Sequence, residues 1–289
     1  MQKAQPKKLL RKPQSQNRPG IESKMKPLPV YDHPHVTGSG KLKNKIALIS
    51  GGDSGIGRAV AILFAKEGAD VAIAYLSENS DAQEAKEIIE NTYKQKCLLI
   101  PGDLSKEAAC KKAVSKTIKE YGRIDILVNN AAIHYESKSL GEISTEQLLK
   151  TFATNIFSYF WLTKEALNHM KENASIINTA SVTAYRGSGT LIDYASTKGA
   201  IISFTRSLSS NLVEKGIRVN AVAPGPIWTP LVAATFEPKK VAQHGSDVPM
   251  KRAGEPVEVA TSYLFLASED GAYFTGQVLH PNGGEIVNG

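Results

Sequence analysis

The sequence predicts an α/β fold: a doubly wound, mostly parallel sheet of seven strands with helices on both faces. Short apolar runs bounded by turn residues alternate with longer segments in which apolar residues recur at helical spacing. A buried parallel strand is apolar throughout, and a crossover segment must precede the next one. The 289 residues, of which 42% are hydrophobic, can bury a core of this size in one domain.

Residues 1–40 do not share this alternation and form a separate, basic arm. They hold six prolines and many Lys, Gln and Ser residues, so we expect an extended, largely disordered segment. Residues 1–45 carry eleven bases and two acids, a net charge of +9, whereas the whole chain carries +7 and the remainder therefore −2. No aromatic residue precedes Tyr31 and no amphipathic pattern is present. We favour a solubilising arm, or one that packs on a neighbouring subunit, over one that binds nucleic acid or a membrane.

Residues 41–289 are expected to form one domain in which strands and helices alternate. The predicted strands are residues 45–50, 71–75, 97–100, 124–128, 174–178, 218–223 and 277–280. The predicted helices are residues 56–67, 80–93, 105–121, 145–171, 194–214 and 256–268. Residues 226–253 hold four prolines and show no clean periodicity. Because they lie between a strand and a helix, we expect a mobile lid rather than a second domain.

Composition also indicates the setting of the protein. No apolar run approaches the roughly 18–20 residues that cross a bilayer, and the basic N-terminus lacks the apolar core of a secretory signal. Cys97 and Cys110 are too few for a disulfide framework, so a reducing, cytoplasmic location is expected. The six histidines are scattered, and neither cysteine lies at ligand spacing from one, so no metal site is expected.

A glycine-rich turn follows the first predicted strand and leads directly into a helix. It reads Ser50-Gly51-Gly52-Asp53-Ser54-Gly55-Ile56-Gly57. Glycines allow a sharp turn and a close approach of the backbone to a phosphate, and the free N–H groups at a helix start attract the anion. Open parallel sheets bind ligands at this edge, beside the first strand, so the turn predicts a site for the pyrophosphate of a dinucleotide.

The spacing of this turn, [Ser/Thr]-Gly-x-x-x-Gly-x-Gly, resembles that of the single-domain short-chain dehydrogenase/reductase family. The resemblance covers about residues 41–289 and leaves out only the arm. It implies a Rossmann-type fold and an NAD(P)-dependent oxidoreductase, which moves a hydride between a nicotinamide cofactor and an alcohol or carbonyl carbon of a small molecule.

The predicted chemistry rests on Tyr194 and Lys198, which lie four residues apart on a predicted helix and therefore project from the same face. A free phenol has a pKa of about 10, too high for a base near neutral pH, and a neighbouring cation is expected to lower it. The Tyr-x-x-x-Lys pattern is weak in isolation. The resemblance implies that Tyr194 is the general acid and base and that Lys198 also holds the nicotinamide ribose.

Two further residues complete the family's catalytic set of four. Ser181 follows the fifth predicted strand, thirteen residues before Tyr194, where its hydroxyl can donate a hydrogen bond to the substrate oxygen. Asn155 lies within a predicted helix, where asparagine is a poor helix former. It is either the site of a local kink or, as the resemblance implies, the holder of a water molecule that relays protons from Lys198.

Cofactor contacts are expected from the loops that follow several strands. Asp103 is placed by the resemblance beside the adenine, although it also suits a helix N-terminus. The turn at residues 129–132 resembles the family's Asn-Asn-Ala-Gly with Ala132 in place of glycine, and residues 224–229 resemble the turn that holds the nicotinamide carboxamide. The expected cofactor-binding residues are Gly51, Asp53, Ser54, Gly55, Ile56, Gly57, Asp103, Leu104, Asn130, Ala131, Ala132, Tyr194, Lys198, Pro224, Gly225, Ile227 and Thr229.

The choice between NAD and NADP is only weakly indicated. The end of the second predicted strand, residues 74–78, lacks the Asp that commonly accepts the ribose hydroxyls of NAD. Asp53 would repel the 2′-phosphate of NADP, and Arg58 is expected to turn along the helix. We therefore favour NAD slightly and allow dual use.

Several alternatives stay open at this point. A sugar or polyol dehydrogenase of the glucose/ribitol type is the main one, and a non-catalytic dinucleotide-binding regulator is another, although the catalytic set is intact. The epimerases of the longer relatives would need a different glycine spacing. His134 is either a substrate-pocket residue or a surface histidine. The resemblance also implies a homo-oligomer, a tetramer or dimer built on residues 145–171 and 194–214.

Overall fold

The computed structural model describes residues 7–287 and contains a seven-stranded parallel sheet with strand order β3-β2-β1-β4-β5-β6-β7. The strands are β1 (Ile46–Ser50), β2 (Asp70–Tyr75), β3 (Cys97–Pro101), β4 (Ile126–Asn129), β5 (Ser175–Thr179), β6 (Arg218–Val222) and β7 (Val278–Leu279). All seven predicted strands are present, each within two residues of its predicted start. The sequence predicts a mostly parallel sheet, and every pairing in the structure is parallel.

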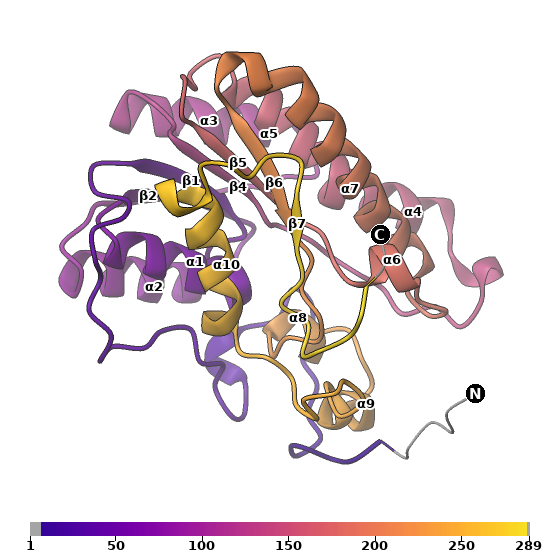
Figure 1. The fold of residues 1–289 in the computed structure, drawn as a ribbon. Coiled ribbons are helices and arrows are strands. Elements are labelled where there is room, and N and C mark those ends of the chain that lie inside the picture. The colour runs from indigo at the N-terminus through magenta and orange to yellow at the C-terminus, as the bar shows by residue number, and fades with distance from the viewer. Residues whose placement is uncertain (1–6, 288–289) are drawn as a thin grey trace.

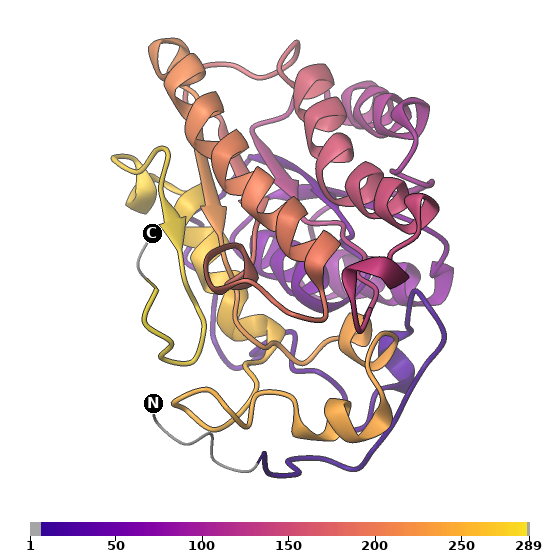
Figure 2. The ribbon, with the colours of Figure 1, turned by 90° about the vertical axis from the view of Figure 1, so that its right-hand side faces the viewer.

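Helices cover both faces of the sheet, as Figures 1 and 2 show. One face carries α1 (Gly55–Lys66), α2 (Asn79–Asn91) and α10 (Pro256–Ala267), and the other carries α3 (Glu107–Tyr121), α5 (Ser158–Ala166) and α7 (Ile192–Leu212). Side chains alternate along the strands between two cores. In β1, Ala47 and Ile49 pack with α1 and α10, whereas Leu48 packs with α3 and α5. The doubly wound Rossmann-type architecture is therefore confirmed.

The helix predicted over residues 145–171 is interrupted in the structure. It consists of α4 (Thr145–Phe152), a π-helical turn at Ala153–Phe157, and α5, which ends at Ala166. A π turn inserts one extra residue into the helical ladder, and such turns are frequent at functional sites. Asn155 lies inside this turn, so the local distortion expected at that residue is present.

The arm is extended, as expected, but the prediction of disorder is wrong for residues 7–40. Apart from one 3-10 turn at Glu22–Lys24, this segment has no regular structure, yet it lies along the lower edge of the domain (Figure 1). Its Met25 is 1% exposed and packs with Trp228 and Val232. Proline-rich composition prevents periodic hydrogen bonding but does not prevent a single extended chain from packing. Residues 1–6 of the predicted arm lie outside the described residues.

The segment predicted as a lid, residues 226–253, contains two short helices, α8 (Pro230–Ala233) and α9 (Pro238–Gln243). Both begin with proline, whose fixed φ suits the first helical position. The arm runs beside both helices, because Leu10 N donates to Ala242 O at 2.7 Å and Gln16 N donates to Ala233 O at 2.9 Å. The arm and the lid thus form one layer below the carboxyl edge of the sheet (Figure 2).

Two features are absent from residues 7–287. No helix there combines the length and the apolar character needed to span a membrane. No group of three or more His, Cys, Asp or Glu side chains in the same residues is placed to hold a metal ion.

Candidate active site

The glycine-rich turn between β1 and α1 has the backbone that dinucleotide binding requires. Gly51 has φ +65° and Gly55 has φ +54°, in the region that favours glycine. A Cβ atom on Gly57 would lie 1.9 Å from the carbonyl oxygen of Gly51, so only glycine fits there. Asn130 Nδ2 donates to the carbonyl oxygens of Ser50 and Gly51, both at 3.1 Å, and thereby holds the turn against the end of β4. The turn therefore fits a pyrophosphate at the start of α1.

A cavity of about 470 Å³ begins at this turn and extends under the lid. Most of the residues predicted from the sequence line it. They are Gly51, Asp53, Ser54, Gly55, Ile56, Asp103, Leu104, Asn130, Ala131, Ala132, Ser181, Tyr194, Pro224, Gly225, Ile227 and Thr229. Three predicted residues do not line it: Gly57 packs against Gly51, and Asn155 and Lys198 lie behind the wall.

Tyr194 and Ser181 come from different elements and meet at the wall of this cavity. Tyr194 lies in the first turns of α7, and Ser181 follows β5. Ser181 Oγ accepts hydrogen bonds from Thr183 N at 3.2 Å and from Thr183 Oγ1 at 3.0 Å. These two bonds hold Ser181 Oγ beside Tyr194, with which it also shares a hydrogen bond. Thr183 therefore restrains the position of the Ser181 oxygen.

Lys198 is buried directly behind Tyr194, with an exposed fraction of 1%. Its Nζ donates to the carbonyl oxygen of Thr179 at 2.7 Å and lies 5.4 Å from the centre of the Tyr194 ring. The spacing of four residues thus brings the two side chains together, as predicted.

The expected lowering of the phenol pKa is wrong, because burial dominates at both residues. Burial raises the pKa of Tyr194 to about 12, and a hydrogen bond with Ser181 opposes this change only in part. Burial also lowers the pKa of Lys198 to about 7. The site therefore holds a protonated phenol at neutral pH, which is the form that donates a proton.

The side chain of Asn155 links the loop after β4 to α7 through hydrogen bonds. Its Oδ1 accepts from Ile133 N at 2.8 Å, and its Nδ2 donates to Ile133 O at 2.8 Å and to Thr197 Oγ1 at 3.2 Å. Thr197 is the neighbour of Lys198, so the amide of Asn155 ties the position of the lysine to the wall of the cavity. The π turn is what directs this buried side chain toward both partners.

The adenine end of the predicted site is lined by carboxylates. Asp103 forms an ion pair with Lys150 at 3.1 Å and accepts from Ser105 N at 3.0 Å, and hydrogen bonds from these two residues hold its pKa below the usual value against the effect of burial. Asp53 and Glu78 also line this end. Burial raises the pKa of Asp53 to about 6, so its carboxylate is charged above that pH.

The opposite end of the site is formed by the turn after β6. A Cβ atom on Gly225 would lie 2.7 Å from Asn282 Cα, which makes glycine necessary. Ile227 and Thr229 line the cavity on either side of Trp228, whose side chain is fully buried on the far side of the turn. Thr229 also contacts the glycine-rich turn, since a Cβ atom on Gly55 would lie 3.1 Å from its methyl group.

The structure decides between the two interpretations of His134 and adds cavity residues that the sequence did not indicate. His134 is 5% exposed, lines the cavity and meets Tyr194 edge-on with ring centres 5.0 Å apart, so the surface interpretation is wrong. Burial lowers its pKa to about 3. Lys150 and His244 were not singled out at all. Of these three residues, only His134 is indicated by the sequence, because it lies four residues after Asn130 of the Asn-Asn-Ala-Ala turn.

A protein with a Rossmann-type sheet, this glycine-rich turn and a paired tyrosine and lysine belongs to the class of dinucleotide-dependent oxidoreductases. The family model described as enoyl-(acyl carrier protein) reductase matches residues 51–285. The chain belongs to the short-chain dehydrogenase/reductase family and is an enzyme of that family.

Named relatives match nearly the whole chain. The chain is 60% identical to the uncharacterized oxidoreductase YhdF of Bacillus subtilis, over 96% of each chain. It is 54% identical to NADPH-dependent aldehyde reductase 1, chloroplastic, of Arabidopsis thaliana, over 93% of this chain and 96% of the relative. It is 50% identical to the glucose and ribitol dehydrogenase of Daucus carota, over 96% of this chain and 97% of the relative.

Solved structures of the family have the same fold. A short-chain dehydrogenase from Burkholderia cenocepacia in complex with NADP superposes with a TM-score of 0.80 at 31% identity, covering 84% of this chain and 98% of its own. A 3-ketoacyl-(acyl-carrier-protein) reductase from Brucella melitensis complexed with NADH gives a TM-score of 0.76 at 32% identity with the same coverage. An NAD(P) cofactor is therefore supported for this chain.

Proposed function

We propose that this enzyme transfers a hydride between NAD(P) and an alcohol or carbonyl carbon of a small molecule, with Tyr194 as the general acid and base. The observation that carries the proposal is that Tyr194 and Ser181 line the same cavity as the glycine-rich turn. A nicotinamide cofactor bound there supplies or accepts the hydride. The protein then has to orient the substrate and move one proton.

The chain's own groups suit these two tasks in the direction of carbonyl reduction. Ser181 donates a hydrogen bond to the carbonyl oxygen and Tyr194 gives the same oxygen its proton. The raised pKa of Tyr194, caused by burial, keeps the phenol protonated before this step. Lys198, fixed by the Thr179 carbonyl, lies close enough to stabilise the phenolate that remains. Oxidation of an alcohol uses the same groups in reverse.

The cofactor preference that we propose is NAD. Asp53 and Glu78 place carboxylates at the adenine end, where a 2′-phosphate would be repelled. Arg58 of α1 does not line the cavity; it is 1% exposed and pairs with Glu22 at 3.3 Å and Glu84 at 3.1 Å, so its charge is already engaged. The Arabidopsis relative is named for NADPH, which makes NADP the competing outcome.

A sugar or polyol is the second candidate substrate class. Polar side chains line the same cavity as Tyr194, among them His134, Lys240 and His244. The ring nitrogen Nδ1 of His134 and the Nε2 of His244 are buried and have no hydrogen-bond partner among the described residues. Several hydroxyl groups on one substrate would satisfy such atoms. The name of the carrot relative points to the same class.

The decisive experiment is a panel of aldehydes, ketones, sugars and polyols, assayed by nicotinamide absorbance with NAD and NADP in both directions. The Tyr194→Phe variant should lose roughly 10²–10⁴-fold in kcat with any active substrate, because it cannot exchange the proton. Tyr185→Phe is the matched control, since Tyr185 lies outside the cavity. Equal turnover by the parent and Tyr194→Phe would remove Tyr194 from the mechanism. A parent that binds cofactor but turns over nothing would favour the non-catalytic regulator.

We further propose a cytoplasmic location and a homo-oligomer, a tetramer or dimer. The two free thiols, Cys97 and Cys110, are buried and unpaired, which suits a reducing compartment. Phe157, at the end of the π turn, is 41% exposed and Phe160 of α5 is 50% exposed, and Phe160 packs at a tilt against Phe204 of α7 with ring centres 4.2 Å apart. An exposed aromatic surface of this kind supports association of subunits through α5 and α7.

A further inference from the structure

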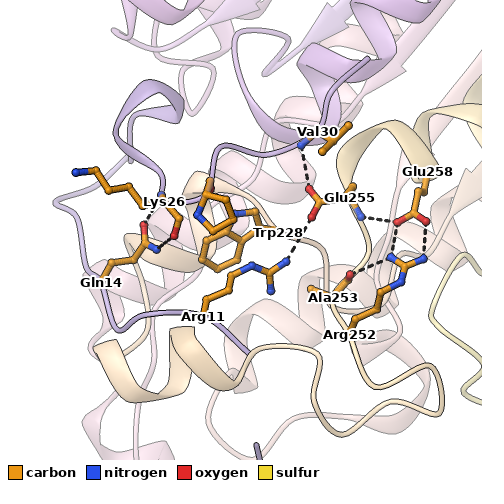
Figure 3. Close-up of polar contacts among 10 residues, drawn as sticks. Arg11, Gln14, Lys26, Val30, Trp228, Arg252, Ala253, Glu255 and Glu258 are labelled. Carbon is orange, nitrogen blue, oxygen red and sulfur yellow. Dashed lines mark hydrogen bonds and ion pairs between the residues drawn. The ribbon is translucent and has the colours of Figure 1, made fainter. Parts of the chain in front are cut away.

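The arm holds Trp228 from two sides. The indole Nε1 of Trp228 donates to the carbonyl oxygen of Pro27 at 2.9 Å. The guanidinium carbon of Arg11 lies 4.2 Å from the centre of the indole ring, in a cation–π contact (Figure 3). Trp228 itself is fully buried, with an exposed fraction of 0%. Arg11, Met25 and Pro27 of the arm all contact Trp228, so the arm contributes to its burial.

A single carboxylate, that of Glu255, fastens this part of the arm to the domain. Glu255 Oε1 pairs with Arg11 Nη2 at 3.3 Å, and Glu255 Oε2 accepts from Val30 N at 2.9 Å (Figure 3). Glu255 caps α10 in a reciprocal arrangement with Glu258, so it is held rigidly. Two points of the arm, nineteen residues apart in the sequence, are therefore anchored on one helix start.

The same arm reaches the other end of the candidate site. Glu22, which is 1% exposed, accepts a hydrogen bond from the backbone N–H of Gly55 and pairs with Arg58 at 3.3 Å. Gly20 lies against the lid, since a Cβ atom there would come within 2.7 Å of the carbonyl oxygen of Pro230. Pro19 and Lys7 of the arm line the cavity itself.

These contacts fall on the two segments expected to hold the cofactor. Trp228 stands between Ile227 and Thr229, and Gly55 opens α1 within the glycine-rich turn. A residue that fixes the indole also restricts the backbone of residues 227–229. A hydrogen bond to Gly55 N restricts the turn.

We propose that the arm is a positioning element of the cofactor site, in which Arg11 acts through Trp228 on the nicotinamide end and Glu22 acts through Gly55 on the phosphate end. This inference rests on the proposed function, because it concerns binding of the nicotinamide cofactor. The match to the relative YhdF extends into the arm: it covers 96% of this chain and so includes most of residues 1–40. The solved structures cover 84% of this chain and nearly all of their own length.

The test uses Trp228 as an optical reporter. The chain has two tryptophans, so Trp161→Phe leaves Trp228 as the only source of indole emission. In this background Arg11→Ala removes the cation over the indole, Arg11→Lys keeps a positive charge there, and Lys12→Ala is the matched control, because Lys12 is exposed. For each full-length variant, the emission spectrum, the Kd for NADH and NADPH by titration, and kcat at saturating cofactor are measured.

We expect Arg11→Ala to shift the emission to the red and to raise the cofactor Kd about ten-fold, with kcat changed less than about two-fold. Arg11→Lys should recover part of both changes, and Lys12→Ala should show neither. If Arg11→Ala does not fold, Arg11→Met takes its place, since it keeps an aliphatic stem over the indole.

Three results would overturn the inference. An unchanged emission spectrum would mean that the arm does not hold Trp228. A red shift with an unchanged cofactor Kd would mean that the contact is structural only. An equal loss of affinity in Lys12→Ala would indicate a general charge effect. Failure of the proposed function is a separate outcome, seen when the parent chain itself binds neither cofactor.

Discussion

At the scale of single residues, burial sets the protonation of the two ionisable groups at the site. The spacing of Tyr194 and Lys198 predicts that they meet, and they do. Their pKa values are not predictable from spacing, because the desolvation of each group depends on the elements packed around it. Burial raises the pKa of the Tyr194 phenol to about 12 and lowers the pKa of the Lys198 ammonium to about 7, so the phenol is protonated at neutral pH and the ammonium is still populated there.

The lowered pKa of Lys198 predicts a pH dependence of stability. In the folded chain its proton is released at a pKa of about 7, whereas the unfolded chain keeps it up to the ordinary value of 10.5. Between these pH values the unfolded state binds more protons, so the free energy of unfolding gains from rising pH. Titration of one proton changes the free energy of unfolding by at most about 1.4 kcal/mol per pH unit.

Urea unfolding of the parent and of Lys198→Met, at several pH values between about 7 and about 10, measures this contribution. The difference in free energy of unfolding between the two proteins should change with pH, with the parent gaining relative to the variant as pH rises. Other titrating groups are common to both proteins and cancel. A difference that stays constant over this range would show that Lys198 keeps its proton in the folded state.

At the scale of elements, α1 and its turn depend on the absence of a single side chain. Gly57 lies inside α1, where a Cβ atom would come within 1.9 Å of Gly51 O. Gly199 lies inside α7, and a Cβ atom there would meet nothing within 4 Å. Two helical glycines therefore have opposite tolerance for alanine.

Gly57→Ala should lower the free energy of unfolding by about 1–3 kcal/mol and weaken cofactor binding, because the glycine-rich turn must shift. Gly199→Ala should raise the free energy of unfolding by about 0.5–1 kcal/mol, as alanine is the better helix former. Thermal unfolding of both variants, with and without NADH, checks the pair. Equal effects of the two substitutions would mean that the close contact at Gly57 is easily relieved.

The elements also show where sequence reasoning succeeds and where it stops. Strands of the parallel sheet are continuous apolar runs, so all seven were predictable, as was the glycine-rich turn with its fixed spacing. The π turn around Asn155 was expected only as a kink, because the extra residue is stabilised by contacts with Ile133 and Thr197 from other elements. Lys150 carries no local signal, since its partner Asp103 is remote in the sequence.

At the scale of the whole molecule, the outer face of α5 and α7 predicts the state of association. Phe160→Glu places a charge in the exposed aromatic surface that Phe160 and Phe204 form. We expect the parent to be a tetramer or dimer and this variant to dissociate toward smaller species, as measured by size-exclusion chromatography with light scattering. Leu140→Glu is the control, because Leu140 is 71% exposed and lies away from α5 and α7 in a 3-10 turn. A parent that is monomeric at assay concentration would remove the proposed interface.

The position of the arm has a consequence for the order of folding. Leu10, Arg11 and Pro27 leave the ribosome long before their partners Ala242, Glu255 and Trp228, which are made more than two hundred residues later. Until those partners are made, these three residues lack their docking contacts, and contacts this remote in sequence form slowly. A segment rich in lysine and proline stays hydrated and unstructured through that interval. The composition that suggests disorder thus suits a segment whose binding surface is synthesised much later.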